Sequence, residues 1–348
     1  MEPSLQKRLL HTLQRIEKEK LPTLHVVMLP DFFVDHFICL ENIEKTCADI
    51  KTVASQGGGN LPGITQRIHQ GGNAANTALA LARLGITAHL ICRTDTLGLH
   101  FLQYFLGKNR VDLSGVKTDG ALAITAALEL KKNQSNVMLG DPGSVAKFSF
   151  ELLDEHDHEL IAGANLVGVT NWNLNHYGTE LASKVFTLAK KNNVKTYFDS
   201  GDPSPRLADI PELMSKVLTN PLLDIFGLNE NELRYYSNCT STTQEEMITA
   251  AWSLKKKIQA RLDLHTSRFS GSFQTTRMIV PTAQLPMVYR YTGAGDAWNA
   301  GNIFAELFEF EDDERLLFAN IFAGHYISSL EPIHPTFDMV LNSIKKTL

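Results

Sequence analysis

The sequence predicts an α/β fold with a doubly wound, mainly parallel sheet that is flanked by helices. Three observations predict it. Short apolar runs of strand length recur along the chain, stretches of helical periodicity lie between them, and the two kinds of segment alternate. Such alternation is typical of a parallel sheet covered on both faces. The expected strands are residues 24–28, 86–91, 165–169, 194–198, 225–228 and 262–264.

Two helices fall between the later strands. Leu181, Val185 and Leu188 recur at helical spacing, and residues 245–259 form a second periodic run. In a sheet of this kind, ligands bind beyond the carboxyl ends of the strands. We therefore expect the functional residues at that edge.

The N-terminal residues 1–23 are predicted to form a helical extension ahead of an α/β domain that spans residues 24–348. Leu5, Leu9 and Leu13 share one helical face. Acidic and basic side chains both occur here, whereas a transit peptide is poor in acids. We expect a surface helix docked on the domain. Membrane binding is the alternative, and the narrow apolar face does not favour it.

Two stretches interrupt the alternation. Residues 40–70 are polar and rich in glycine. Residues 122–139 contain two strand-like runs, 122–130 and 136–139, around a turn at 131–135. The two stretches are either ordinary surface excursions or parts of a small β lid, and their pattern alone does not choose between these explanations.

The composition excludes several classes of protein. The chain has 348 residues, of which 43% are hydrophobic and 20% are charged, as is typical of a globular protein. Its formal net charge of −5 does not suggest nucleic acid as a main partner. No apolar run reaches membrane-spanning length. The four cysteines lie far apart, without a Cys-x-x-Cys pair, which indicates a reducing, cytoplasmic location.

The most informative segment is residues 291–301, which read Tyr-Thr-Gly-Ala-Gly-Asp-Ala-Trp-Asn-Ala-Gly. A turn of small residues opens an amphipathic helix, and the free amides at such a helix start bind anions. A carboxylate such as Asp296 is unusual at an anion site unless it has a task. We interpret it as the acceptor of the proton from a hydroxyl that attacks a phosphoryl group. The alternative is an aspartate that only caps the helix.

A second glycine segment, residues 70–85, also opens a helix. Gly71 and Gly72 allow the backbone to approach a ligand closely. Asn73 or Asn76 offers both donor and acceptor groups to a polyol. The alternative is a capped and tightly packed helix without a ligand.

Together, the two segments resemble the paired signatures of the ribokinase-like carbohydrate kinases, also called the phosphofructokinase-B family. The resemblance extends from about residue 24 to the end of the chain. It implies the ribokinase-like α/β fold, with a small β lid over the substrate formed by about residues 40–70 and 115–140. In relatives such a lid can form dimers, so a homodimer through the lid is expected here.

The resemblance implies catalytic roles for the later segment. Asp296 is expected to be the catalytic base. The turn Gly293-Ala294-Gly295 is expected to form the anion hole, in which the backbone amides of Ala294, Gly295 and Asp296 stabilise the charge on the transferring phosphoryl group.

The resemblance also implies which residues bind the acceptor. Asp35, which follows the first strand, is expected to bind substrate hydroxyls together with Asn76. Gly71 and Gly72 are expected to let the sugar ring approach the backbone.

Other residues resemble nucleotide and metal-binding motifs. Asn229 and Glu232 match an Asn-x-x-Glu motif that in relatives organises Mg²⁺ and phosphate, and Glu232 is expected to act on Mg²⁺ through water. Thr266 and Gly271 fit the two ends of a Thr-x-Gly-x-x-Gly nucleotide loop. Arg268 departs from that pattern, because it stands where the middle glycine is usual; its side chain is long enough to stack on a base or meet a phosphate.

Arg290 is a second departure. Relatives often have an aspartate at this position, two residues before Thr292, that helps to hold a monovalent cation. An arginine cannot ligate K⁺, so activation by potassium at the usual site is not expected. The guanidinium of Arg290 either takes over that role or belongs to a solvated residue at the end of a strand.

The resemblance implies an Mg²⁺-dependent kinase with ATP, ADP or GTP as donor. Its acceptor would be an alcohol, a primary hydroxyl of a sugar, a sugar phosphate or a nucleoside. Two alternatives are a kinase of a vitamin-like heterocycle and a non-catalytic, regulatory sugar- or nucleotide-binding protein of the same fold. A dinucleotide-binding oxidoreductase is not favoured, because Leu29-Pro30-Asp31 follows the first strand in place of a Gly-x-Gly-x-x-Gly turn.

Overall fold

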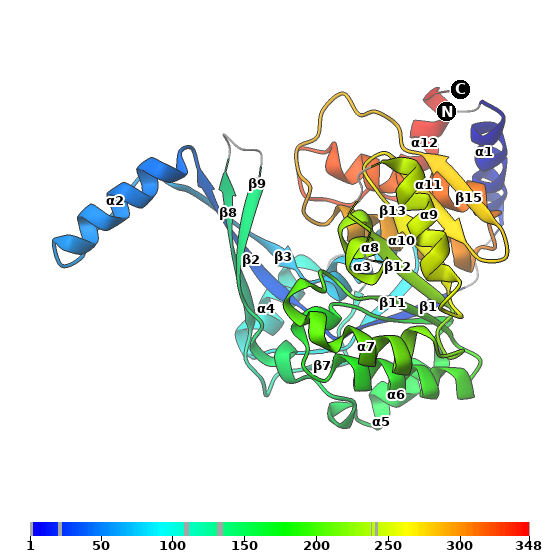
Figure 1. Ribbon diagram of the computed structural model, residues 1–348, viewed down its shortest axis with the longest axis horizontal. Helices are drawn as coiled ribbons and strands as arrows, with labels where there is room; N and C mark the ends of the chain where they lie inside the picture. The colour runs from blue at the N-terminus through cyan, green and yellow to red at the C-terminus, as the bar shows by residue number, and fades with distance from the viewer. Residues whose placement is uncertain are drawn as a thin grey trace.

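The computed structural model describes residues 3–19, 23–107, 111–130, 135–237, 239–240 and 243–347. Within these residues a nine-stranded sheet forms the centre of the molecule, with helices on both faces (Figure 1). Its strands pair in parallel from β6 to β13, whereas β14 and β15 add in antiparallel orientation. The order across the sheet is β15 (Arg277–Pro281), β14 (Phe269–Phe273), β13 (Arg261–His265), β12 (Ile225–Asn229), β11 (Lys195–Asp199), β10 (Leu166–Val169), β1 (His25–Leu29), β4 (Thr87–Leu90) and β6 (Val111–Asp112).

The predicted doubly wound, mainly parallel sheet is confirmed. Each of the six expected strands is present, and its bounds differ from the expectation by at most one residue at either end. These strands were visible in the sequence because a parallel strand covered on both faces is a nearly continuous apolar run. Strand β14 was missed because serine and glycine interrupt its apolar residues, although all five of its residues are buried.

Helices cover the two faces of the sheet around separate hydrophobic cores. One face carries α1 (Pro3–Lys18), α3 (Asn73–Arg83), α4 (Thr96–Phe105), α10 (Ala294–Leu307), α11 (Asp312–Ile327) and α12 (Phe337–Thr347). The other carries α5 (Glu155–Gly163), α6 (Gly178–Lys191), α7 (Ile210–Leu213), α8 (Glu230–Ser237) and α9 (Gln244–Lys255). None of the helices that the structure describes has the length and apolar character needed to cross a membrane.

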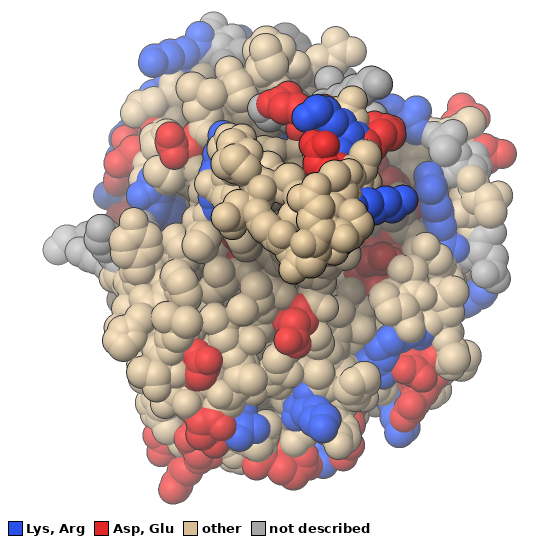
Figure 2. Space-filling view, turned by 90° about the vertical axis from the view of Figure 1, so that its left-hand side faces the viewer, with Lys and Arg blue, Asp and Glu red and all other residues tan. Residues whose placement is uncertain are grey.

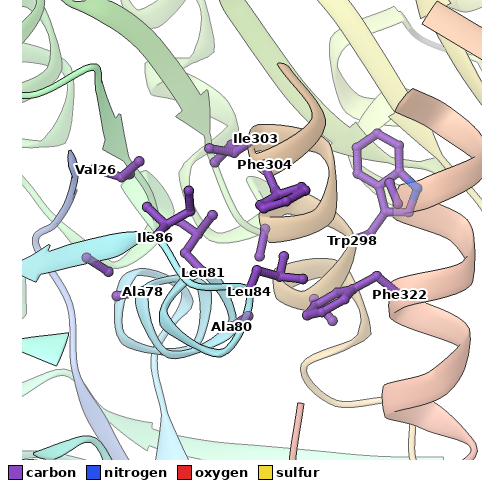
Figure 3. Close-up of a cluster of buried hydrophobic side chains, with 14 of the residues drawn as sticks. Val26, Ala78, Ala80, Leu81, Leu84, Ile86, Trp298, Ile303, Phe304 and Phe322 are labelled. Atoms are coloured by element: carbon purple, nitrogen blue, oxygen red, sulfur yellow. The ribbon is translucent and has the colours of Figure 1, made fainter. Parts of the chain in front are cut away.

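Helices α3 and α10 pack side by side against the sheet. Figure 3 shows Ala78 and Leu81 of α3 in one apolar cluster with Ile303 and Phe304 of α10, and all four side chains are buried. This contact matters for function, because each helix begins with one of the two glycine segments.

Four further strands form a small sheet that stands apart from the large one (Figure 1). Its order is β3 (Thr65–Gly71), β2 (Phe33–Leu40), β8 (Ala123–Leu130) and β9 (Ser135–Asp141). The expected interruptions therefore contain strands, but β2 begins well before residue 40 and was not predicted. Residues 131–134 of the expected turn lie outside the described residues.

The connection between β2 and β3 contains a helix that was not predicted. Helix α2 (Ile43–Ser55) begins at the cap Asn42, whose side chain accepts a hydrogen bond from the Lys45 amide. None of its residues is buried, and it projects away from the rest of the molecule (Figure 1).

The N-terminal helix α1 docks on the domain. Leu9, Leu13 and Ile16 are buried in the core shared with α11 and α12. Thr12 donates a 3.0 Å hydrogen bond to Glu314 of α11.

A buried ionic network holds α10 and α11 against the sheet. The carboxylate of Asp263, in β13, accepts hydrogen bonds of 2.9 Å each from Arg315 of α11 and Asn302 of α10. Arg261 of the same strand also donates to Asp263. The network positions the helix whose N-terminus carries the later glycine segment.

Candidate active site

The N-terminus of α10 is a turn that needs glycine. Gly293 caps the helix with φ of +80°, a left-handed conformation that favours glycine. A Cβ at this position would lie 2.8 Å from the Tyr326 hydroxyl oxygen, so a side chain would also clash. The sequence showed the turn but not that Tyr326 packs against it.

Two amides at this helix start are free. The amides of Gly295 and Asp296 have no hydrogen-bond acceptor among the described residues. The Ala294 amide differs from the expectation, because it donates to the Tyr291 carbonyl oxygen at 3.1 Å. The unpaired donors at this end of α10 are therefore those of residues 295 and 296, and the helix dipole favours an anion there.

Asp296 lies in the first turn of α10 and is 8% exposed. Its carboxylate accepts a 2.9 Å hydrogen bond from the side-chain amide of Asn76 in α3. Burial raises the pKa of Asp296 well above its usual range; the bond from Asn76 opposes this rise, and the carboxylates of Asp199, Asp31 and Asp35 add to it. The structure thus brings together Asp296 and Asn76, which were expected to have different roles, in catalysis and in acceptor binding.

Asp35 lies in β2 of the small sheet and is also buried. Burial raises its pKa to about 6, a hydrogen bond from Thr125 opposes the rise, and Asp31 adds to it. A Cβ on Gly71 would lie 2.3 Å from the Asp35 carboxyl group, so position 71 has to be glycine while Asp35 keeps this orientation. Asp35 therefore lies directly beside the diglycine segment.

Asp31 organises the diglycine segment and was missed as a site residue. Its fully buried carboxylate accepts hydrogen bonds from the amides of Asn73, at 2.7 Å, and Ala74, at 3.1 Å, at the start of α3. It also accepts bonds of 2.9 Å each from Thr170 and Asn171, which follow β10. The sequence did show a carboxylate soon after the first strand, which could have marked Asp31 as a site residue. Its hydrogen-bond partners, however, are distant in the sequence.

A further carboxylate anchors α10 to the large sheet. Asp199, at the end of β11, accepts hydrogen bonds from the Asn299 side chain, at 2.6 Å, and the Gly201 amide, at 2.9 Å. Burial raises the pKa of Asp199. Because Asn299 lies in α10 one turn after Asp296, this bond helps to orient the helix start.

The Asn-x-x-Glu segment forms a reciprocal cap on α8. The Asn229 side-chain oxygen accepts hydrogen bonds from the amides of Asn231 and Glu232. The two Glu232 carboxylate oxygens accept from the Asn229 amide, at 2.9 Å, and its side chain, at 2.7 Å. Burial raises the pKa of Glu232 well above its usual range, and Asp199 adds to the rise. A cavity of about 260 Å³ adjoins the segment and is also lined by Asp202, Arg234 and Tyr235.

This donor set fits Mg²⁺ held through water. Each Glu232 oxygen accepts one hydrogen bond and keeps a lone pair for a metal-bound water. Among the described residues, no group of three or more His, Cys, Asp or Glu side chains is arranged to ligate a metal directly. Mg²⁺ characteristically keeps several waters and uses few protein ligands, as this arrangement would require.

The residues expected to bind the nucleotide belong to two different elements, a turn and a strand. Thr266 stabilises the turn between β13 and β14, since its hydroxyl oxygen accepts hydrogen bonds from the amides of Arg268 and Phe269. Gly271 lies within β14, where a Cβ would meet the Phe273 ring at 2.8 Å and Ile279 at 2.9 Å. Gly271 is therefore a residue of a packed strand, and the loop itself is confined to residues 266–268.

The turn at Thr266 lies close to the start of α10. His265, which precedes Thr266, pairs with Asn229 in the sheet. A Cβ on Gly295 would lie 3.3 Å from His265 Nε2, and the His265 ring stacks on Trp298. The turn at Thr266 and the pair Asn229–His265 thus lie near Gly295, while Asn76, which has an expected acceptor role, contacts Asp296.

Arg290 is half-buried, lies outside the strands and is bound to the end of α11, so it is not a freely solvated residue at the end of a strand. Its guanidinium donates hydrogen bonds to the carbonyl oxygens of Tyr326, Leu330 and Glu331, at 2.9, 2.7 and 2.9 Å. It also lies over the Tyr326 ring, with Cζ 5.3 Å from the ring centroid.

Figure 2 views the face from which the small sheet and α2 project. A recess lies beside this projection, with acidic atoms inside and basic side chains around its rim.

Comparison with known proteins identifies the family to which the chain belongs. A family model described as pfkB family carbohydrate kinase matches residues 43–336. The bifunctional protein HldE of Aliarcobacter butzleri (strain RM4018) is 24% identical over 327 residues, which cover 91% of this chain and 63% of that protein. The chain thus spans less than two thirds of that relative's length. Ribokinase of Haemophilus influenzae is 25% identical over 272 residues, which cover 77% of this chain and 84% of that protein.

Among solved structures, Arabidopsis thaliana ribokinase complexed with ribose and ATP shares the fold. It superposes with a TM-score of 0.75 at 20% identity, covering 93% of this chain and 99% of that chain. The central sheet, the small sheet and the family match agree with one another. This chain is therefore a kinase and belongs to the pfkB family of carbohydrate kinases.

Proposed function

We propose that the protein transfers a phosphoryl group from a nucleotide to a primary hydroxyl of a sugar, a sugar phosphate or a nucleoside. One observation carries the proposal: the buried carboxylate of Asp296 shares the start of α10 with the free amides of residues 295 and 296. A base and an anion site at one helix start meet the two requirements of phosphoryl transfer to an alcohol.

Asp296 is the general base in this proposal. As the acceptor oxygen forms its bond to phosphorus, the bond to the leaving nucleotide oxygen breaks and the hydroxyl proton moves to Asp296. Burial raises the pKa of Asp296 above its usual range, so its carboxylate is a stronger proton acceptor than that of an exposed aspartate. Asn76 orients the carboxylate through its 2.9 Å hydrogen bond.

The anion hole is formed by the amides of Gly295 and Asp296. They point away from the helix without a protein acceptor, so they are available to oxygens of the transferring group. Gly293 shapes the turn that exposes them.

Asp35 binds hydroxyls of the acceptor. It is held beside Gly71 and Gly72, and it is close enough to Asp296 to raise the pKa of that carboxyl group. Glycine at positions 71 and 72 leaves room for the carboxyl groups of Asp35 and Asp31, which would lie 2.3 and 2.8 Å from a Cβ there, and so lets Asp35 sit beside the diglycine segment.

ATP, ADP or GTP is the donor and Mg²⁺ is the metal. The bound ATP of the Arabidopsis ribokinase structure supports a nucleotide donor for the shared fold. Thr266 and Arg268 lie on the proposed nucleotide side of α10. Glu232 and Asn229 would hold Mg²⁺ through water, and the ion would neutralise charge on the phosphates.

The small sheet acts as a lid over the acceptor in this proposal. Asn136 of β9 donates a 3.2 Å hydrogen bond to Thr292, directly before the turn at Gly293, so the sheet reaches over the proposed site. Covering the site would exclude water, which competes with the acceptor for the phosphoryl group.

The lid also joins two copies of the chain. Ile68, Ile124, Val137 and Leu139 are exposed on the face of the small sheet opposite Asp35. Pairing with a second copy would cover this apolar face. Sedimentation analysis is expected to show a dimer for the wild type and a monomer for Ile124→Asp; a monomeric wild type contradicts this part of the proposal.

A panel of acceptors tests the proposed activity. Sugars, sugar phosphates and nucleosides are incubated with ATP, ADP or GTP and Mg²⁺, and phosphorylated product is measured by mass spectrometry. Asp296→Asn is the inactive control. Formation of product by the wild type alone supports the proposal. Binding of sugar and nucleotide without product favours the non-catalytic regulatory protein, and product from a heterocyclic alcohol alone favours the kinase of a vitamin-like compound.

A further inference from the structure

Arg290 holds three backbone carbonyl groups around one positive charge. Tyr326 lies in the last turn of α11, and Leu330 and Glu331 lie in the loop that follows. The last carbonyl groups of a helix lack partners within the helix and carry partial negative charge. The guanidinium satisfies the carbonyl of this turn and two more from the loop, at 2.7 to 2.9 Å.

The same contact reaches the turn before α10. Arg290 lies three residues before Gly293, and the neighbouring Tyr289 amide donates a 2.9 Å hydrogen bond to the Ile327 carbonyl oxygen. The Tyr326 ring lies between Arg290 and that turn: the guanidinium lies over the ring, and the hydroxyl packs where a Cβ of Gly293 would be. Movement of Arg290 would therefore displace the Tyr326 ring and the Tyr289–Ile327 hydrogen bond, the two contacts that support the turn at Gly293.

We propose that Arg290 is a positioning residue for the anion hole, and that its guanidinium acts as a built-in cation which fixes the end of α11 against the turn at Gly293. The proposal rests on the proposed function of that turn. Carbonyl oxygens are also ligands of K⁺. The covalently attached guanidinium already fills the position on which these three carbonyl oxygens converge, so the wild-type activity is independent of monovalent ions.

This proposal differs in its consequences from a purely structural cap on α11. A cap contributes to stability only. A positioned cation controls the geometry of the amides at residues 295 and 296, and a displacement of about 1 Å in a reacting geometry can lower turnover on the order of 100-fold. It also predicts that a small cation can replace the side chain after it is removed.

The test compares Arg290→Ala and Arg290→Lys with the wild type in buffers that contain KCl, NaCl or tetramethylammonium chloride, with and without guanidinium. Arg93→Ala is the matched control, because Arg93 also donates to a backbone carbonyl, that of Asp119, and its hydrogen bonds among the described residues go to Asp119 rather than to α10 or α11. Turnover with the best acceptor and thermal unfolding are both measured.

We expect the wild type and Arg93→Ala to have the same kcat in all three salts. Arg290→Ala is expected to lose about 10- to 100-fold in kcat, with a smaller change in KM for the acceptor, and to regain activity with guanidinium or K⁺. Its thermal midpoint is expected to rise in KCl relative to tetramethylammonium, whereas that of the wild type does not change. Arg290→Lys keeps the charge but not the fork of donors, and is expected to be intermediate.

Three results would overturn the proposal. These are a wild-type kcat that requires K⁺, a folded Arg290→Ala variant with normal turnover, and a loss that neither guanidinium nor K⁺ reverses. If Arg290→Ala does not fold, the salt dependence of the wild type and the activity of Arg290→Lys decide the question. A wild type inactive towards every acceptor contradicts the proposed function instead, while the comparison of thermal midpoints still tests the cation site.

Discussion

The side-chain amide of Asn76 donates a 2.9 Å hydrogen bond to the carboxylate of Asp296, which lies 220 residues further along the chain. The bond joins the first turns of α3 and α10, the two helices that begin with glycine segments. The packing of apolar side chains between these helices brings the two residues within reach (Figure 3).

Asp296→Asn is expected to lower kcat by about 10²- to 10⁴-fold, because the amide cannot accept the hydroxyl proton. The fold should persist, since the new side chain has nearly the same shape. Circular dichroism and steady-state kinetics check both statements. Asp49→Asn, on the exposed helix α2, is the matched control and should have normal turnover. Normal turnover of Asp296→Asn would exclude this residue as the base.

Asn76→Ala is expected to move the acid limb of the kcat profile to higher pH. The hydrogen bond from Asn76 stabilises the charged carboxylate and so lowers the pKa of Asp296. Without the bond the pKa rises further, and a higher pH is needed to deprotonate the base. The pH dependence of kcat in both proteins measures the shift. An unchanged acid limb would show that the bond does not control the ionisation of the base.

Asp35→Ala is expected to raise KM for the acceptor more than KM for the nucleotide, because the carboxylate binds acceptor hydroxyls in the proposed site. In the wild type, kcat/KM for the acceptor should fall as the pH decreases through about 6, where Asp35 becomes protonated. Initial rates measured at varied acceptor concentration and at varied nucleotide concentration give the two KM values separately. Equal increases in both would remove Asp35 from acceptor binding.

Gly293→Ala is expected to destabilise the protein and reduce activity. Its φ of +80° is strained for alanine, and the new Cβ would lie 2.8 Å from the Tyr326 hydroxyl oxygen. Thermal unfolding and kcat are the measurements. Gly163→Ala is the control, because a Cβ there meets nothing within 4 Å. Adding Tyr326→Phe should restore part of the loss, because it removes the closest contact of the new Cβ. If nothing is recovered, the loss comes from backbone strain or from the remaining contact with the ring.

Arg315→Met is expected to lower the free energy of unfolding by about 3–5 kcal/mol, because it breaks a buried ionic network around Asp263. Burial opposes the charged form of Asp263, but Arg261 and Arg315 outweigh it and hold the pKa below its usual range. The stability that this carboxylate contributes is therefore present above the usual aspartate pKa and is lost as the pH falls below it. Denaturant unfolding at several pH values checks this. Arg8→Met, which removes an exposed ion pair to Asp313, should have little effect.

The main features of the fold were accessible from sequence because they depend on local patterns. Apolar runs covered on both faces predicted the parallel strands, and glycines before amphipathic stretches predicted the starts of α3 and α10. Strand β2 was missed because Asp35 and His36 interrupt its apolar residues. Helix α2 was missed because none of its residues is buried, so it lacks the apolar stripe by which a core-packed helix is recognised.

Only part of the candidate site could be predicted from the sequence. Some site residues could be predicted because they lie within short motifs of neighbouring residues. These are Asp296, Gly293 and the Asn229–Glu232 pair. The Ala294 amide was misassigned because its acceptor depends on how the turn at Tyr291 folds. Arg290 was ambiguous because its three acceptors are backbone atoms, which no side-chain pattern reveals.

The sequence by itself determined the six buried parallel strands and the helix starts that bear glycine and a carboxylate, because period, turn chemistry and capping act over a few residues. The tertiary structure alone decided which of these groups meet. Asp31 joins the start of α3 to the end of β10, Asn76 reaches Asp296, and Arg290 binds the end of α11. These partners are separated by tens to hundreds of residues, and only the packing of the sheet and helices specifies their distances.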